Sequence, residues 1–299
     1  HAVGEAAGYE IYDVRANSNG IIWTESNILN ENWRVYCAVY NSLQETISNP
    51  KLLDEGNADW EVPFIAAIGD YAYWQLRPKV SGNASFDNSL LKRAIFRDVG
   101  LTPNVQIVLQ SAGRFATAPY PLADALVVTP RAALDTVNYQ LTYLDGRSAS
   151  VMDTMVLPNS MRPFEAGYGK TGFMFSFDAI YNYGRGLAGL GTYIPEDAVR
   201  SGNYSEAPWF RFGRVPSAAP CWCGNTLVVK SVTNIACISL TKRNYCVLDI
   251  PSGTDDYGEY VASTGMGSSL VTFAQVDYTA LNGAVQKYCQ VRVWQEKNE

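Results

Sequence analysis

The sequence contains very little histidine, and this scarcity excludes most familiar catalytic sites. Histidine is the usual general base at neutral pH and the commonest metal ligand, yet the 299 residues include only one, His1. A Ser-His-Asp or Cys-His site would have to use this first residue. Metal sites built on two or three histidines are excluded within one chain. We therefore expect no catalytic residue, no metal site and no cofactor, and a protein that is not an enzyme.

Long apolar runs and clusters of basic residues are also missing. Apolar runs such as residues 64–68 last only a few residues, whereas a membrane-spanning helix needs about 20. The 23 Lys and Arg residues are outnumbered by 29 Asp and Glu, for a net charge of −6, and they form no cluster that would grip a phosphate backbone. These absences predict no membrane span and no sequence-specific nucleic-acid partner.

Most of the chain is typical of short strands separated by turns. The segment 33–40 is aromatic and β-branched, as a half-buried strand requires, and 24 glycines and 14 prolines separate the strand-like runs. The expected strands lie at residues 9–14, 21–24, 33–40, 71–76, 105–110, 125–129, 137–143, 173–177, 226–232, 235–240, 245–250, 270–276 and 288–294. The pattern predicts an all-β fold, an antiparallel sandwich or jelly roll with one or two short helices.

One segment has a helical pattern. Leu90, Leu91, Ala94 and Ile95 form an apolar stripe within residues 88–99, and Gly100 follows where a left-handed residue would end the helix. Residues 42–47 and 195–200 suggest single turns, and Gly283 would break a helix within residues 277–288. No repeat or low-complexity linker divides the chain. We expect a single β-rich domain over residues 1–299, with accessory loops or a subdomain within 150–220.

The six cysteines leave the compartment open. Three disulfides would fit a secreted protein, and six small buried thiols would fit a reducing compartment. The glycosylation sequons at Asn83 and Asn203 are about as many as chance supplies, so they do not decide. The cysteines are Cys37, Cys221, Cys223, Cys237, Cys246 and Cys289.

A glycine-rich segment resembles a dinucleotide-binding fingerprint but lacks its context. Gly184, Gly186 and Gly189 have the GxGxxG spacing, which requires a helix to begin at the glycines. Gly191 and Pro195 follow too soon for such a helix. The segment therefore predicts a surface loop.

Aromatic residues gather in the same part of the chain and form the candidate binding loops. Loop aromatics supply a large, rigid contact area for glycans or protein partners, and interleaved arginines suit the same kind of interface. An equally good alternative is that these rings cover the open end of a sandwich. The candidate residues are Tyr181, Tyr183, Arg185, Tyr193, Tyr204, Trp209 and Arg211.

Six carboxylates near aromatic residues allow a further alternative, a glycosidase that uses two acids. Such a pair can be recognised only by its separation in space, and solvated carboxylates between strands explain the pattern better. The acids are Asp59, Glu61, Asp70, Asp153, Glu165 and Asp178.

Residues 260–273, with the sequence YVASTGMGSSLVTF, resemble the approach to the last strand in picorna-like viral capsid jelly rolls. The resemblance implies a virion structural protein, a capsid shell subunit or a projecting spike, located in the virion. Its partners would be copies of itself, sister capsid subunits and a host receptor or glycan. Gly267-Ser268 stands where that family commonly has an acidic pair.

We therefore expect a non-enzymatic oligomer that acts by self-assembly and receptor contact. A secreted carbohydrate-binding protein of lectin type is the main alternative, and the two-acid glycosidase is a lesser one.

Overall fold

The computed structural model describes about the first half of the chain almost continuously and mainly strands in the rest. The described residues are 1–41, 43–79, 88–97, 102–132, 138–157, 162–169, 172–177, 192–193, 210–211, 221–223, 226–230, 234–239, 242, 244–249, 254–255, 261–263, 269–279 and 283–295. The chain divides into two compact units, His1–Arg162 and Pro163–Glu299. The expectation of one domain over 1–299 stays a prediction.

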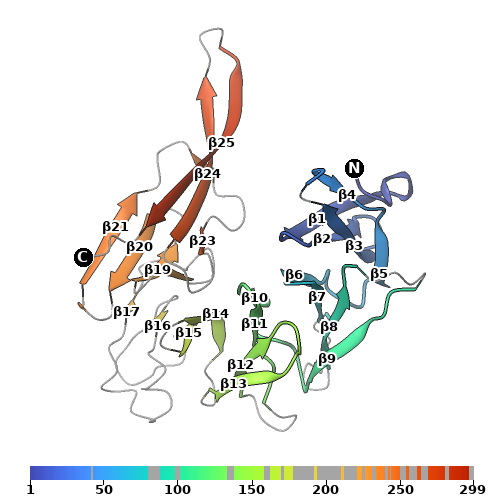
Figure 1. Cartoon of the computed structure of the whole chain (residues 1–299), viewed down its shortest axis with the longest axis horizontal. Coiled ribbons are helices and arrows are strands. Elements are labelled where there is room, and N and C mark those ends of the chain that lie inside the picture. Colours follow the sequence, from blue (N-terminus) through green and yellow to red (C-terminus); the bar gives the residue numbers. More distant parts are fainter. Residues whose placement is uncertain are drawn as a thin grey trace. The chain divides into compact units, whose positions relative to one another are not determined.

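The first unit consists of three antiparallel sheets whose strands follow one another in the chain (Figure 1). A single turn of 3-10 helix, η1 (Glu5–Ala7), precedes them. The first sheet contains β1 (Tyr9–Ala16), β2 (Gly20–Asn27), β3 (Trp33–Asn41), β4 (Thr46–Ile47) and β5 (Lys51–Gly56). The second sheet contains β6 (Phe64–Ile68), β7 (Tyr71–Leu76), β8 (Ser89–Ile95) and β9 (Gln106–Ser111). The third sheet contains β10 (Tyr120–Pro121), β11 (Ala125–Val128), β12 (Gln140–Asp145) and β13 (Val151–Val156).

Turn chemistry in the sequence explains how these strands are joined. Asn17 accepts hydrogen bonds from the backbone N–H groups of Asn19 and Gly20 at 2.9 and 3.1 Å, closing the turn between β1 and β2. Gly69, between β6 and β7, has a φ of 53°, a left-handed conformation that glycine adopts without steric cost.

The second unit contains three more antiparallel sheets. The fourth sheet contains β14 (Pro163–Gly169), β15 (Gly172–Phe177), β16 (Thr192–Tyr193) and β17 (Phe210–Arg211). The fifth sheet contains β18 (Cys221–Cys223), β19 (Thr226–Lys230), β20 (Asn234–Ser239) and β21 (Asn244–Asp249). The sixth sheet contains β22 (Thr254–Asp255), β23 (Val261–Ser263), β24 (Ser269–Thr279) and β25 (Val285–Gln295).

The all-β expectation is confirmed, but the jelly-roll expectation is wrong. A jelly roll joins its strands through Greek-key connections, so sequential strands lie in different sheets. Here each strand of the second, third, fourth and fifth sheets pairs with the next strand in the chain. Repeated four-stranded sheets of this kind are the blades from which β-propellers are built. None of the described helices is long and apolar enough to cross a membrane.

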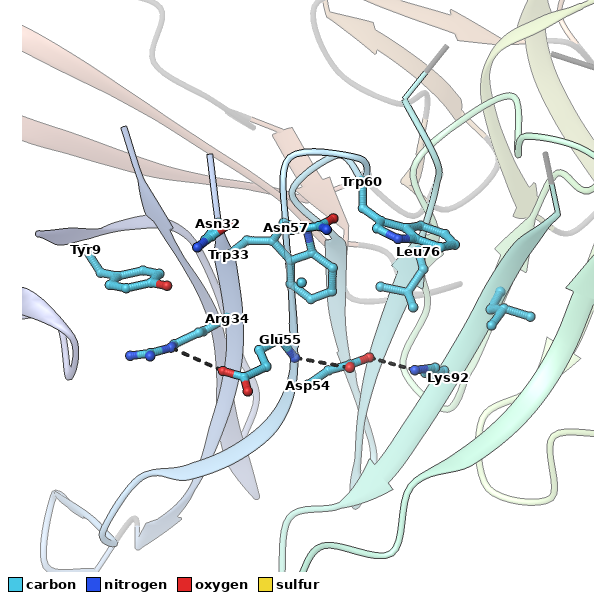
Figure 2. A pocket seen from close by; sticks show the side chains of 12 residues that line it. Tyr9, Asn32, Trp33, Arg34, Asp54, Glu55, Asn57, Trp60, Leu76 and Lys92 are labelled. Atoms are coloured by element: carbon cyan, nitrogen blue, oxygen red, sulfur yellow. Dashed lines mark hydrogen bonds and ion pairs between the residues drawn. The ribbon is translucent and has the colours of Figure 1, made fainter. Parts of the chain in front are cut away.

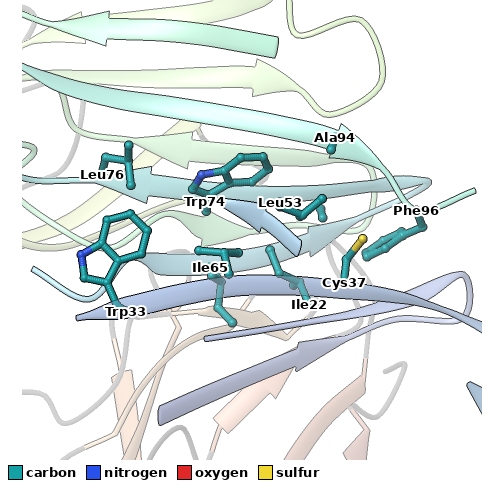
Figure 3. Close-up of a cluster of buried hydrophobic side chains, with 11 residues drawn as sticks. Ile22, Trp33, Cys37, Leu53, Ile65, Trp74, Leu76, Ala94 and Phe96 are labelled. Atoms are coloured by element: carbon teal, nitrogen blue, oxygen red, sulfur yellow. The ribbon is translucent and has the colours of Figure 1, made fainter. Parts of the chain in front are cut away.

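The second sheet is buried on both faces. Ala72, Trp74 and Ala94 join a core cluster with Ile22, Val35 and Cys37 of the first sheet (Figure 3). Tyr73 and Leu91 point to the opposite face and pack with Leu126, Val128 and Leu144 of the third sheet. Successive residues of β6, β7 and β8 therefore alternate between two cores, since strand side chains point to opposite faces.

This double burial corrects the helix expected over residues 88–99. Its described residues form strand β8, with Leu91 in one core and Leu90 packed against the other. A strand that is covered on both faces is apolar on both faces, so its sequence also matches a helical stripe. The turn expected over residues 42–47 ends in the two-residue strand β4, and the turn expected over 195–200 lies outside the described residues.

The end of the chain bears on two further expectations: Gly283 interrupts residues 277–288 as expected, whereas the expectation for the capsid-like segment is corrected. Residues 277–288 form no helix in their described part, because β24 runs to Thr279 and β25 begins at Val285, with Gly283 at a φ of 78° between them. The capsid-like segment, residues 260–273, is not one irregular stretch that leads into a strand. Its two described parts pair with each other, Val261 opposite Thr272 and Ser263 opposite Leu270.

Candidate functional site

A cavity of about 640 Å³ opens in the first unit (Figure 2). Its volume falls within the range of small-molecule sites, about 300–1,000 Å³. The cavity is lined by residues of the first and second sheets and of the segment between them. These residues are the aromatic Tyr9, Trp33 and Trp60, the charged Arg34, Asp54, Glu55 and Lys92, the amides Asn32 and Asn57, and Leu76, Leu90 and Gly56.

The pairing of β3 with β5 positions the residues that form one wall of the cavity. Trp33 lies opposite Gly56, and Arg34 lies opposite Glu55. A Cβ atom on Gly56 would stand 2.2 Å from Cζ2 of Trp33, so only glycine lets the indole lie against β5. Trp33 is 2% exposed, and its indole nitrogen has no hydrogen-bond partner among the described residues. Burying an N–H group without an acceptor lowers the stability of the fold. A ligand that accepts a hydrogen bond from this indole N–H would remove that cost.

Asp54 connects the two sheets at the base of the cavity. One carboxylate oxygen, Oδ2, accepts hydrogen bonds from Nζ of Lys92 and Nε1 of Trp74, each at 2.8 Å. Its other oxygen accepts a hydrogen bond from the backbone N–H of Glu55 at 3.1 Å. Lys92 lies on β8 and Trp74 on β7, so this carboxylate fixes the first sheet against the second. The Lys92 ammonium has two further donors.

A second pair of charges lies nearer to solvent. Nε of Arg34 lies 3.5 Å from Oε2 of Glu55, and the guanidinium covers the Tyr9 ring with 4.3 Å to its centroid. The Glu55 side chain is 62% exposed. The cavity therefore offers aromatic surface, carboxamides and charges of both signs. The charges of its described lining residues cancel, since two are basic, Arg34 and Lys92, and two are acidic, Asp54 and Glu55.

Two of the binding residues predicted from the sequence lie on described strands of the second unit. Tyr193 and Arg211 lie on the paired strands β16 and β17, where Tyr193 stands opposite Phe210 and Arg211 opposite Thr192. The other five lie outside the described residues, namely Tyr181, Tyr183, Arg185, Tyr204 and Trp209. The binding role of all seven stays a prediction.

Five of the six carboxylates considered for glycoside hydrolysis lie among the described residues. Glu61 forms ion pairs with Arg77 and Arg114. Asp59 accepts a hydrogen bond from the Asn57 side chain at 3.2 Å, and Asp70 accepts one from the Asn19 side chain at 3.1 Å. Asp153 lies on β13 and Glu165 on β14, and Asp178 lies outside the described residues. Within the described residues, no group of three or more His, Cys, Asp and Glu side chains could hold a metal ion.

Sequence reasoning missed the cavity because its walls come from distant segments. A signal was nevertheless present. Trp33 and Trp60 each follow an asparagine-containing turn, Asn32 directly before Trp33 and Asn57 three residues before Trp60. Binding residues are frequent on loops, and aromatic side chains supply a large contact area.

Neither a protein-family model nor a curated protein sequence matches the chain. Solved structures do match it. The crystal structure of a puromycin hydrolase has a TM-score of 0.53 at 12% identity, covering 95% of this chain and 45% of that chain. A structure from a study of two prolyl endopeptidases has a TM-score of 0.52 at 10% identity, covering 97% of this chain and 43% of that chain. The β-propeller domain of the Trilobed protease from Pyrococcus furiosus has a TM-score of 0.46 at 9% identity, covering 97% and 84%.

The first two matches bear on the fold alone, because their identity is so low. The chain spans less than half the length of either structure. Their likeness concerns the arrangement of successive antiparallel sheets that the chain shows.

These findings correct the functional expectations drawn from the capsid resemblance. The two structures described above with TM-scores above 0.5 are a puromycin hydrolase and a prolyl endopeptidase, and neither is a virion component. A capsid or spike role, assembly with sister capsid subunits and a location in the virion are therefore wrong for this chain. The lectin and glycosidase alternatives gain no support either. The short capsid-like segment reflects the alternation that strands of many folds share.

Proposed function

We propose that the chain is a non-catalytic recognition module of β-propeller type that binds short peptides in the cavity of the first unit. The observation that carries this proposal is the convergence of Trp33, Trp60, Lys92 and Glu55 on one cavity of about 640 Å³. Peptidase neighbours suggest the ligand class, since a domain of this fold accompanies peptide hydrolysis in those proteins.

The cavity chemistry is complementary to a peptide. Asn32 and Asn57 each supply an amide donor and an amide acceptor, which match the N–H and C=O groups of a peptide backbone. Trp33, Trp60 and Leu76 supply apolar surface for one side chain. The Lys92 ammonium suits a terminal carboxylate, and the exposed Glu55 carboxylate suits a terminal amine. The balance of charges favours a zwitterionic peptide over a strongly charged one.

The absence of catalysis is part of the proposal. The single histidine, His1, is exposed, its Nδ1 lies 3.2 Å from Oε1 of Glu5, and it is not among the described residues that line the cavity. Asp54 is occupied by Lys92 and Trp74. We expect peptides to be bound and recovered intact.

Titration with di- and tripeptides tests the proposal, because two tryptophans of the cavity report binding through their fluorescence. Calorimetry should give the same affinities, and mass spectrometry should show uncleaved peptides.

We expect Lys92→Gln and Trp60→Leu to weaken binding by about tenfold or more. Lys51→Gln, on the neighbouring β5 but outside the cavity, is the matched control and should bind as the unmodified protein does. Absence of binding by any peptide at millimolar concentration would refute the proposal.

A further inference from the structure

Two thiols on neighbouring strands of the fifth sheet lie directly opposite each other. In the antiparallel pairing of β20 with β21, Cys237 stands opposite Cys246, and the register is continuous on both sides of this pair, from Asn234 to Ser239. Side chains of directly opposite residues project from the same face of a sheet, with Cβ atoms about 4.5–5.5 Å apart. The two thiols are close enough for a hydrogen bond between them.

The spacing of paired strands suits a disulfide bond between these two residues. Opposite residues of antiparallel strands have Cα atoms about 4.5 or 5.5 Å apart, depending on the hydrogen-bond pattern. Both separations fall within the range of about 4.4–6.8 Å that disulfides span. The Cβ atoms must approach by about 1 Å to reach the usual separation of about 3.8 Å. Among the described strands β21 pairs only with β20, so no second paired strand opposes this small movement.

The sheet topology also selects Cys246 as the partner of Cys237 over the other cysteines of this sheet. Cys221 and Cys223 lie on β18, and β19 lies between β18 and β20. Two strand spacings of about 4.8 Å each, about 9–10 Å in total, separate β18 from β20. Two cysteines whose Cα atoms are more than about 7 Å apart cannot be bridged without backbone movement. The strand order therefore leaves Cys246 as the partner within this sheet.

The two thiols differ in their access to solvent. Cys246 is exposed, and its neighbours along β21, Tyr245 and Val247, are 74% and 48% exposed. A small oxidant dissolved in water therefore reaches Cys246 directly. Cys237 is partly buried, and burial together with the neighbouring Cys246 raises the pKa of its thiol to about 12. Because the thiolate is the reactive form of cysteine, the oxidant reacts with Cys246 first.

We propose that Cys237 and Cys246 form a reversible redox site, at which a peroxide oxidises the two thiols to a disulfide bond between β20 and β21. First, the Cys246 thiolate attacks a peroxide oxygen, so that an S–O bond forms, the O–O bond breaks and the peroxide is reduced. The Cys237 sulfur then attacks the sulfenic sulfur of Cys246. An S–S bond forms, the S–O bond breaks, and the hydroxyl leaves as water with the Cys237 proton.

The electrons of this reaction balance within the pair. The two thiols supply the two electrons that reduce one peroxide, and an external dithiol returns them by thiol–disulfide exchange. The bond joins the edge strand β21 covalently to the sheet. The site lies in the second unit and shares no residue with the cavity of the first unit, so the proposal is independent of peptide binding.

Oxidation of the reduced full chain with hydrogen peroxide at pH 8 tests the proposal. After alkylation of the remaining thiols, trypsin cleaves at Lys242 and Arg243, between the two cysteines, and mass spectrometry without reduction maps the products. We expect one dominant cross-link, in which the Cys237 and Cys246 peptides are joined with loss of two hydrogens, and its reversal by dithiothreitol. Its rate should not change on tenfold dilution of the protein, because the bond forms within one chain.

Three variants assign the steps. Cys246→Ser should abolish the cross-link, and Cys237→Ser should leave a sulfenic acid at Cys246 that dimedone traps. Cys223→Ala, on the same sheet but separated from β20 by β19, is the matched control and should form the cross-link at an unchanged rate. Circular dichroism of each reduced variant is compared first, and the map of the unmodified protein decides alone for a variant that does not fold.

Three results would overturn the proposal. In the first, peroxide leaves Cys237 and Cys246 unlinked in the folded, unmodified protein. In the second, the dominant product joins Cys246 residues of two chains, and its rate rises with protein concentration. In the third, a folded Cys223→Ala variant loses the cross-link, which would assign the bond to a different pair.

Discussion

At the scale of single residues, a partly buried thiol and an exposed thiol lie on neighbouring strands of the fifth sheet. Cys237 on β20 stands directly opposite Cys246 on β21. Burial, together with the neighbouring Cys246, raises the pKa of the Cys237 thiol to about 12. Cys246 is exposed. Because the thiolate is the reactive form of cysteine, these two residues should differ strongly in reactivity.

We expect iodoacetamide at pH 8 to modify Cys246 quickly and Cys237 slowly in freshly reduced protein. Peptide mass spectrometry after timed quenching measures both rates, and a Cys246→Ser variant isolates the slow one. The protein unfolded in denaturant is the control and should react at both positions. Equal rates at the two cysteines of the folded protein would contradict the expectation.

The same pKa sets the direction of a pH effect on stability. The thiol has an ordinary value of 9.0 and a folded value of about 12. Between these values the folded chain keeps the proton and the unfolded chain has lost it, so the unfolding free energy decreases as the pH rises. Below about pH 9 this group has no effect on stability.

At the scale of elements, a tight contact joins the second sheet to the third. The hydroxyl of Tyr73 donates to the carbonyl of Gly146 at 2.6 Å, and Arg93 Nη1 donates to the carbonyl of Arg147 at 2.8 Å. A Cβ atom on Gly146 would stand 2.3 Å from Cγ2 of Ile68 and 2.8 Å from the carbonyl oxygen of Asp124. The turn that follows β12 therefore has no room for a side chain at this position.

We expect Gly146→Ala to lower the unfolding free energy by about 1–3 kcal/mol, because a backbone oxygen cannot move aside. Gly113→Ala is the matched control, since the three atoms nearest to its new Cβ all belong to the Arg131 side chain, which can change rotamer. Urea denaturation of both variants measures the difference. If Gly113→Ala proves as destabilising as Gly146→Ala, the backbone contact of Gly146 with Asp124 is not what makes the substitution costly.

Strand positions were predicted well where aromatic residues are frequent, because such residues suit a pleated surface. The expectation for residues 71–76 matches β7, and that for 33–40 matches β3 except for its last residue. Strand β8 was taken for a helix because Leu90, Leu91 and Ala94 are apolar on both faces. Strand β5 (Lys51–Gly56) was missed because it contains Lys51, Asp54 and Glu55, whose roles depend on partners elsewhere in the chain.

At the scale of the whole molecule, the first unit contains its own cores. The described members of three core clusters all lie within His1–Arg162. In proteins made of successive similar sheets, each sheet is stabilised mainly by its neighbours. A fragment of residues 1–162 should therefore fold without the second unit.

We expect this fragment to show a β-type circular dichroism spectrum and one cooperative unfolding transition by tryptophan fluorescence. A fragment of residues 1–97 is the control. It lacks Leu126, Val128 and Leu144, which cover one face of the second sheet, so it should aggregate or remain unfolded. A gradual, non-cooperative transition for residues 1–162 would show that the first unit needs the second to fold.

The sequence by itself determined the all-β class, the position of most strands and the turns that separate them. These properties depend on residues close together in the chain, through alternation and turn chemistry. Only the tertiary structure decided that the strands form successive sheets of four or five strands, that Asp54 meets Lys92 and that Glu61 meets Arg114. These partners lie tens of residues apart, and a local pattern does not contain the stacking of sheets that brings them together. The candidate cavity therefore became visible only in three dimensions.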